Sequence, residues 1–143
     1  DSSYAGTSSA FTVEPGNLHH FGWSMIPTQA AGVAFGPTPP TTITITAYDL
    51  AGNMTPKDEA GVSLGTETVI FTTNATLARD GTHAPTYKGL DMTGAGQTGT
   101  IDLTGGACTL TTDDFALYNA AAGQTLTGCR RCGAPSNSNI AGR

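Results

Sequence analysis

The sequence predicts an all-β fold, an antiparallel β-sandwich with extended terminal segments. Apolar and polar residues alternate in several short segments, most clearly from Thr42 to Tyr48, where Ile43 and Ile45 share one face and threonines the other. This two-residue period is typical of strands that are buried on one face. The 143 residues include 19 glycines and 8 prolines, which favour frequent turns. Because no long segment has the 3.6-residue period of an amphipathic helix, we expect strands joined by turns.

Two further strands are predicted before this one. The first covers residues 10–13 and places Phe11 and Val13 on one face. The second covers residues 18–26 and carries Trp23, the only tryptophan, which we expect in the core. The proline-rich stretch that follows predicts an extended entry into the Thr42 strand, because proline fixes φ and has no N–H to donate.

The second half of the chain predicts four clear strands and two weak ones. The clear strands cover residues 67–73, 100–104, 108–112 and 124–129, and the weak ones residues 62–64 and 87–90. Gly105 and Gly106 predict a hairpin between the second and third of the clear strands. Asp113 and Asp114 are expected to open a turn or a single helical turn that runs to Tyr118.

The alternation predicts one shared core and therefore one folded domain. Its expected members are Trp23, Ile43, Ile45, Val69, Phe71, Ile101, Leu103 and Leu110. We expect residues 1–17 to form an N-terminal extension and a candidate donor strand, residues 18–129 the sandwich, and residues 130–143 a C-terminal tail. The length of the chain suits a single domain of this kind.

Composition and charge exclude several classes of protein. The net charge is −5, and among the six basic residues only Arg130 and Arg131 are adjacent, whereas a nucleic-acid surface needs a basic stripe. No apolar run is long enough to span a membrane. The chain begins Asp-Ser-Ser-Tyr without a charged-then-apolar leader, which indicates a processed mature chain or a fragment. Few charges and many hydroxyl groups suit an extracellular surface or a surface within an assembly.

Several short motifs resemble bacterial Ig-like surface repeats of the adhesin type. The run from Ile43 to Asn53, ITITAYDLAGN, resembles their strand-and-turn motif VTVTAxDxxGN. Other matches are His20-Phe21-Gly22-Trp23, Ala31 to Phe35, Ala75-Thr76-Leu77 and Gly123 to Thr127. The resemblance spans residues 20 to 128 and implies an Ig-like sandwich that serves in stalks, adhesion or assembly without catalytic residues. The proline-rich insert, the three cysteines and the extensions depart from the repeats and look like adaptations for joining subunits.

The cysteines predict at least one disulfide among Cys108, Cys129 and Cys132. Cys129-Arg-Arg-Cys132 has the spacing of a redox or metal pair, but it lacks a βαβ context, a second cysteine pair and a following histidine. A Cys108–Cys129 bond would join two adjacent late strands and contribute about 3 kcal/mol, although the alternation then requires a bulge. A Cys129–Cys132 turn bridge is the rival. Either pairing leaves one cysteine for an intermolecular bond or a free thiol.

Metal binding has two weak candidates. The neighbouring His19 and His20 could form half a site, although the other histidine is distant in sequence. Oxygen ligands gather near one loop, which makes calcium a candidate cofactor there. These candidate ligands are Asp49, Asn53, Asp58 and Glu59. Their spacing is not that of an EF-hand, and we expect Asp49 and Asn53 to cap a turn instead.

An enzyme is the third alternative, because paired carboxylates for glycoside cleavage stay open. The chain has no Gly-x-Ser-x-Gly motif for a serine hydrolase, and the adjacent Asp113 and Asp114 would point to opposite faces of a strand. Asn53-Met-Thr55 and Asn74-Ala-Thr76 match the N-glycosylation sequon, which is accidental in a bacterial protein.

The sequence therefore favours a non-enzymatic structural subunit of an extracellular or cell-surface appendage or filament. Its expected partners are other copies of itself, joined by β-strand addition, with Phe11 and Val13 as the assembly residues. No nucleic-acid or membrane partner is expected. The alternative is a glycan-binding or adhesion module of a larger surface protein that recognises surface glycans through aromatic residues such as Tyr48 or Tyr118.

Overall fold

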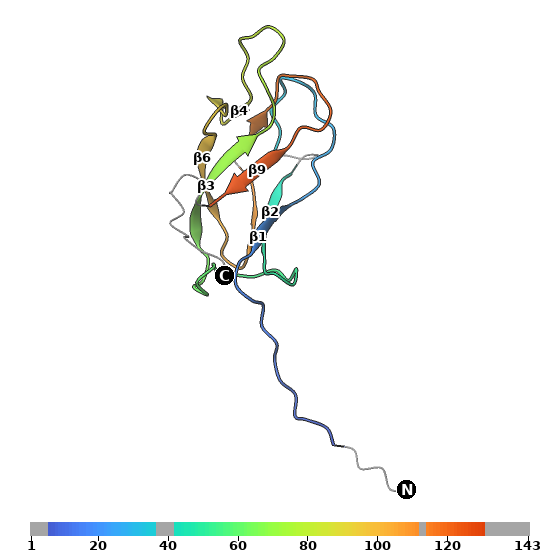
Figure 1. Cartoon of the computed structure of the whole chain (residues 1–143), viewed down its shortest axis with the longest axis vertical. Coiled ribbons are helices and arrows are strands. Elements are labelled where there is room, and N and C mark those ends of the chain that lie inside the picture. Colours follow the sequence, from blue (N-terminus) through green and yellow to red (C-terminus); the bar gives the residue numbers. More distant parts are fainter. Residues whose placement is uncertain (1–5, 37–41, 112–113, 131–143) are drawn as a thin grey trace, which may run out of the picture.

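A computed structural model describes residues 6–36, 42–111 and 114–130. Within these ranges the protein is all-β, without a helix (Figure 1). The strands are β1 (His20–Trp23), β2 (Thr44–Tyr48), β3 (Thr66–Thr73), β4 (Thr86–Tyr87), β5 (Leu90–Asp91), β6 (Gln97–Asp102), β7 (Ala107–Thr109), β8 (Phe115–Ala116) and β9 (Leu126–Cys129). They form three antiparallel three-stranded sheets with the orders β1-β2-β7, β6-β3-β9 and β5-β4-β8.

Strand β2 is the centre of the first sheet. Its alternation is observed as predicted, since Ile45 and Ala47 are buried and the intervening threonine and tyrosine side chains are half-buried. Ile45 lies opposite Trp23 of β1 and Cys108 of β7. Strand β1 pairs with residues 45–48 of β2 and β7 pairs with residues 44–46, so neighbours on both edges hold the apolar face of β2 against the core.

Strand β3 is the centre of the second sheet and lies between β6 and β9. Val69 and Phe71 are buried, as predicted, and Phe71 pairs with Gly128 of β9. Gly99 of β6 pairs with Val69, and a Cβ there would collide with the Tyr87 hydroxyl and the Phe71 ring. Glycines in both neighbouring strands thus leave the space that the large Phe71 ring occupies.

The third sheet contains a tight hairpin between β4 and β5. Lys88 and Gly89 both have positive φ angles, of 51° and 73°. Two such residues are the requirement of a type I′ turn, whose twist matches that of the flanking strands. The weak strand predicted at residues 87–90 is therefore two short strands joined by a turn.

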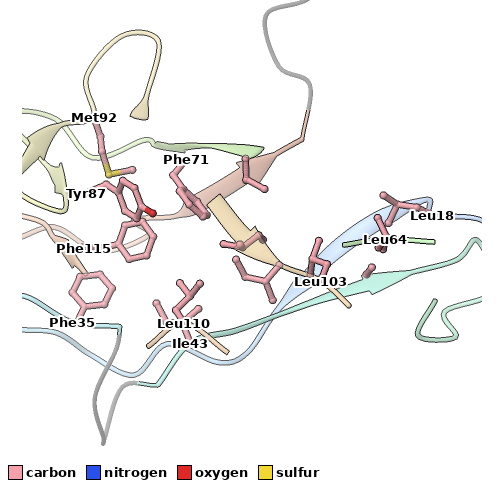
Figure 2. Packing of buried hydrophobic residues seen from close by; sticks show 14 residues of the cluster. Leu18, Phe35, Ile43, Leu64, Phe71, Tyr87, Met92, Leu103, Leu110 and Phe115 are labelled. Atoms are coloured by element: carbon pink, nitrogen blue, oxygen red, sulfur yellow. The ribbon is translucent and has the colours of Figure 1, made fainter. Parts of the chain in front are cut away.

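One hydrophobic core joins all three sheets. Figure 2 shows Phe35, Phe71, Tyr87 and Phe115 gathered at one end and Leu18, Leu64 and Leu103 at the other. Seven of the eight predicted core residues are buried, and they are Ile43, Ile45, Val69, Phe71, Ile101, Leu103 and Leu110. The eighth, Trp23, is half-buried and packs against the edge of this core.

Several predicted elements are wrong. Residues 10–13 are not in a strand, and Gly105-Gly106 does not close a hairpin, because β6 and β7 belong to different sheets. The chain instead crosses from one sheet to the other at these glycines, which both have positive φ angles. The alternative of a helical turn up to Tyr118 also fails, since β8 occupies that stretch; Asp113 lies outside the described residues.

Candidate functional site

The N-terminal arm, which we define as residues 6–13, extends away from the folded body (Figure 1). The side chains of Phe11 and Val13 are 80% and 81% exposed. Contacts with the body begin directly after the arm, where Glu14 pairs with Lys57 at 2.9 Å. Two apolar side chains on one extended segment therefore face solvent next to the point where the chain joins the body.

The root of the arm is fixed by the carboxylate of Asp49. This carboxylate accepts hydrogen bonds from the N–H of Gly16 at 2.8 Å, from the N–H groups of Ala51 and Asn53, and from the Asn53 side chain at 3.1 Å. The Gly16 bond, followed by those from Asn53, lowers the pKa of Asp49 to about 2. Asp49 and Asn53 thus cap the turn after β2, as expected, and Asp49 also ties that turn to the chain that leads into β1.

Two edge strands face the core without pairing with each other. Strand β1 pairs only with β2, and β9 pairs only with β3, within the part of the chain that the structure describes. We call the region between residues 18–31 and residues 117–130 the seam. An edge strand keeps a row of N–H and C=O groups for another strand, so the seam offers hydrogen-bonding edges from two different sheets.

A cavity lies at each end of the seam. The apolar cavity has a volume of about 440 Å³ and lies between residues 26–31 and 117–126, with Ile26, Phe35, Leu117 and Leu126 in its wall. The charged cavity has a volume of about 380 Å³ and is lined by residues 18–21, Glu59 and residues 128–130. Each cavity is therefore lined on one side by the segment that contains or follows β1 and on the other side by the segment that contains or precedes β9.

Trp23 crosses the seam between the two cavities. Its ring makes edge-to-face contacts with Phe71 and Phe115, with ring centroids 6.0 and 6.4 Å apart. A Cβ at Gly128 of β9 would lie 3.2 Å from the same ring. The indole therefore rests on β9 at a position where a larger side chain would push it away.

Arg130 closes the charged end of the seam. Its guanidinium bonds Glu67 at 2.6 Å and Glu59 at 2.7 Å, and lies 3.5 Å from Asp58. Burial lowers the pKa of Arg130, the three carboxylates raise it, led by Glu67, and the net shift is upward. Because Asp58 and Glu59 belong to the loop after β2, the ion pairs fasten that loop to β3 and to the end of β9.

The candidate calcium ligands are not brought together. Asp49 and Asn53 bond each other and the turn, whereas Asp58 accepts N–H groups from Ala60 and Val62 and, with Glu59, contacts Arg130. The Val62 bond is the main reason that the pKa of Asp58 is lowered. No group of three metal-ligating side chains occurs in residues 6–36, 42–111 and 114–130. His19 and His20 contact each other at 3.2 Å.

Cys108 and Cys129 lie on different sheets. Cys108 of β7 is opposite Ile45, and Cys129 of β9 is opposite Ile70. They are thus not in adjacent strands, which removes the basis for expecting a bond between them. Cys132 lies outside the described residues, and a disulfide among the three stays a prediction.

The aromatic residues considered for glycan binding are partly covered. The Tyr48 ring stacks on His20, and the Tyr118 ring stacks on His83, with centroids 5.5 and 5.2 Å apart. Tyr118 also lies against Gly32. Sugar rings bind open aromatic faces, so neither tyrosine presents a bare platform.

Both sequon asparagines have hydrogen-bonded side chains. The Asn53 amide donates to Asp49, and the Asn74 side chain bonds the main chain of Gly123 and Thr125. They therefore serve to fix turns.

Comparison with known proteins gives no further guidance. No protein-family model, curated protein or solved structure matches this chain. The described residues contain no helix that is both long and apolar enough to cross a membrane. The resemblance to bacterial Ig-like surface repeats therefore stays a prediction.

Proposed function

We propose that this protein is a non-enzymatic structural subunit of an extracellular surface appendage or filament, and that its body is an Ig-like β-sandwich. Subunits assemble by β-strand addition, in which the arm of one copy pairs with an edge strand of the next. The observation that carries this proposal is an extended arm with two exposed apolar side chains on a body whose sheets have edges without a strand partner among the described residues. Strand addition buries the apolar side chains of the arm and pairs the main chain of the sheet edge at the same time.

The energetics of docking favour a preformed acceptor. Burying Phe11 and Val13 contributes about 1.5–3 kcal/mol each, whereas ordering residues 10–13 costs about 1–2 kcal/mol per residue. Main-chain hydrogen bonds to an edge strand, at about 0.5–1.5 kcal/mol each, offset the remaining cost. Association is therefore favourable when the partner surface needs no rearrangement.

The first experiment compares the wild type with a full-length Phe11→Asp/Val13→Asp variant by light scattering and negative-stain electron microscopy. We expect the wild type to form polymers and the variant to stay monomeric with an unchanged urea midpoint. Leu50→Asp is the matched control, because Leu50 is 80% exposed in a turn of the body and should not affect assembly. A monomeric wild type, or a double variant that polymerises normally, would contradict the proposal.

A further inference from the structure

The seam has the chemistry of an acceptor for this arm. The wall of the apolar cavity contains no charged residue, and the arm, Gly-Thr-Ser-Ser-Ala-Phe-Thr-Val, contains none either. Phe11 supplies one large ring, and Leu126 and Ile26 supply aliphatic walls from the two sides of the seam. Apolar plugs that enter a cavity beside a free strand edge are the features by which strand addition selects its ligand.

The main-chain groups on the outer edge of β1 point away from β2. The Ser24 N–H donates to Thr44 of β2, so alternation turns the main-chain groups of Gly22 toward β2 and those of Phe21 and Trp23 outward. Strand β9 likewise has its second edge without a strand partner in the described residues. A segment lying in the seam can therefore form a ladder with either strand.

A chain cannot place Phe11 in its own apolar cavity. Glu14 and Gly16 are held to Lys57 and Asp49 on the body. Phe11 is only three residue steps from Glu14, a reach of about 10 Å, whereas the length of chain from Leu18 to Trp23 is roughly 17 Å. The cavity wall begins still farther along, at Ile26. An arm that enters this cavity must therefore come from a second copy.

We propose that the seam between β1 and β9 is the acceptor site for the arm of a neighbouring copy, with Phe11 of that copy in the apolar cavity. This inference rests on the proposed function and adds the location of the acceptor. Trp23 is the only tryptophan, and its ring lies against Gly128, which lines the charged cavity, so its fluorescence reports a segment that docks in the seam.

The test uses the full-length Phe11→Asp/Val13→Asp variant as acceptor and a synthetic peptide of residues 6–13 as donor. We expect a saturable change in Trp23 fluorescence on peptide addition. A control peptide with serine in place of Phe11 and Val13 should cause no change. If the arm peptide leaves the fluorescence of Trp23 unchanged, the proposed acceptor site is wrong.

A second pair of substitutions maps the site without disturbing the core. Ala121→Arg places a long charged side chain at the rim of the apolar cavity from an exposed position, and should weaken peptide binding by at least about tenfold. Ala51→Arg, at an exposed position in the turn after β2, should leave binding unchanged. Equal binding by both variants would overturn the assignment.

Cross-linking separates failure of the site from failure of the function. A photoreactive phenylalanine analogue at position 11 of the wild-type chain should cross-link to residues 26–31 or 117–126 of a neighbour. Polymers that depend on Phe11 but cross-link elsewhere would refute the seam and keep the proposed function. Absence of both polymers and intermolecular cross-links would refute both.

Discussion

Strand β2 and the arm have similar local sequences and opposite surroundings. Residues 44–48 of β2 and residues 11–13 of the arm both alternate apolar and polar side chains and contain β-branched residues. Ile45 of β2 is 2% exposed, whereas Phe11 of the arm is 80% exposed. Strand β2 lies between two neighbouring strands, and the arm pairs with none of the described strands.

The comparison teaches two things. Alternation determines which side chains share a face, and the presence of a partner strand determines whether that face is buried. The threonine-rich strand β2 is stable because β1 and β7 pair with its two edges. The arm is expected to behave as a strand whose partner is supplied by another molecule. Substitutions in the two segments should therefore affect different properties, namely the stability of the body and the formation of polymers.

The largest expected difference is between Ile45→Ala and Phe11→Ala. Ile45→Ala should lower the free energy of unfolding by about 2–5 kcal/mol, because it removes a fully buried side chain from the core. Phe11→Ala should change the free energy of unfolding by less than about 0.5 kcal/mol. Urea denaturation at concentrations where the protein is monomeric measures both. A large loss of stability in Phe11→Ala would show that the arm packs on its own body.

A smaller loss is expected where a glycine makes room for the Phe71 ring. Gly99→Ala should cost about 1–3 kcal/mol, since its Cβ would press on the Tyr87 hydroxyl and the Phe71 ring. Gly65→Ala is the control, because no atom lies within 4 Å of a Cβ at that position. Thermal unfolding of the two variants provides the comparison, and equal melting temperatures would mean that the core relaxes freely around Gly99.

The ion pair between Arg130 and Glu67 in the body can be compared with the ion pair between Glu14 and Lys57 at the root of the arm. Glu67→Gln should cost about 1 kcal/mol, because the Arg130 side chain is only 14% exposed and loses a charged partner. Glu14→Gln should have no measurable effect on stability, since its pair with Lys57 lies at the surface. Urea midpoints of the wild type and the two variants test this. The reverse ranking of the two variants would place the stabilising charges at the root of the arm.

The smallest effect concerns the pH dependence of Asp49. Its folded-state pKa of about 2 is below the unfolded value of about 4, so the contribution of the carboxylate is complete above pH 4 and is lost as the pH falls toward 2. The difference in stability between the wild type and Asp49→Asn should therefore shrink between pH 5 and pH 2. A difference that stays constant over this range would mean that the carboxylate is not the group that is stabilised by Gly16.

Sequence reasoning located the elements whose burial follows from local alternation. Strands β2, β3 and β6 have enough alternating residues to define an inward face, and their predicted core residues are buried. Strands β4, β5 and β8 have two residues each, which is too short for any period to be visible. Their positions depend on tertiary pairing, which also explains why residues 115–116 form a strand instead of a helical turn.

The seam was not predictable, because it forms where strands from two different sheets meet. Phe11 and Val13 stood out in the sequence as an apolar pair in a polar extension, but nothing in the alternation indicates that β1 and β9 are both edges. The one local signal was Gly128, an isolated glycine in a strand, which usually marks a close approach of another group. In the structure that group is the ring of Trp23.

Hydrogen exchange of the assembled protein tests the central claim most directly. If the arm is a strand of the neighbouring subunit, its amides at residues 7–13 should be strongly protected in the polymer and unprotected in the Phe11→Asp/Val13→Asp monomer. Trp23 and residues 126–129 should gain protection in the polymer as well. Arm amides that exchange at the rate of an unfolded chain in the assembled material would contradict the account.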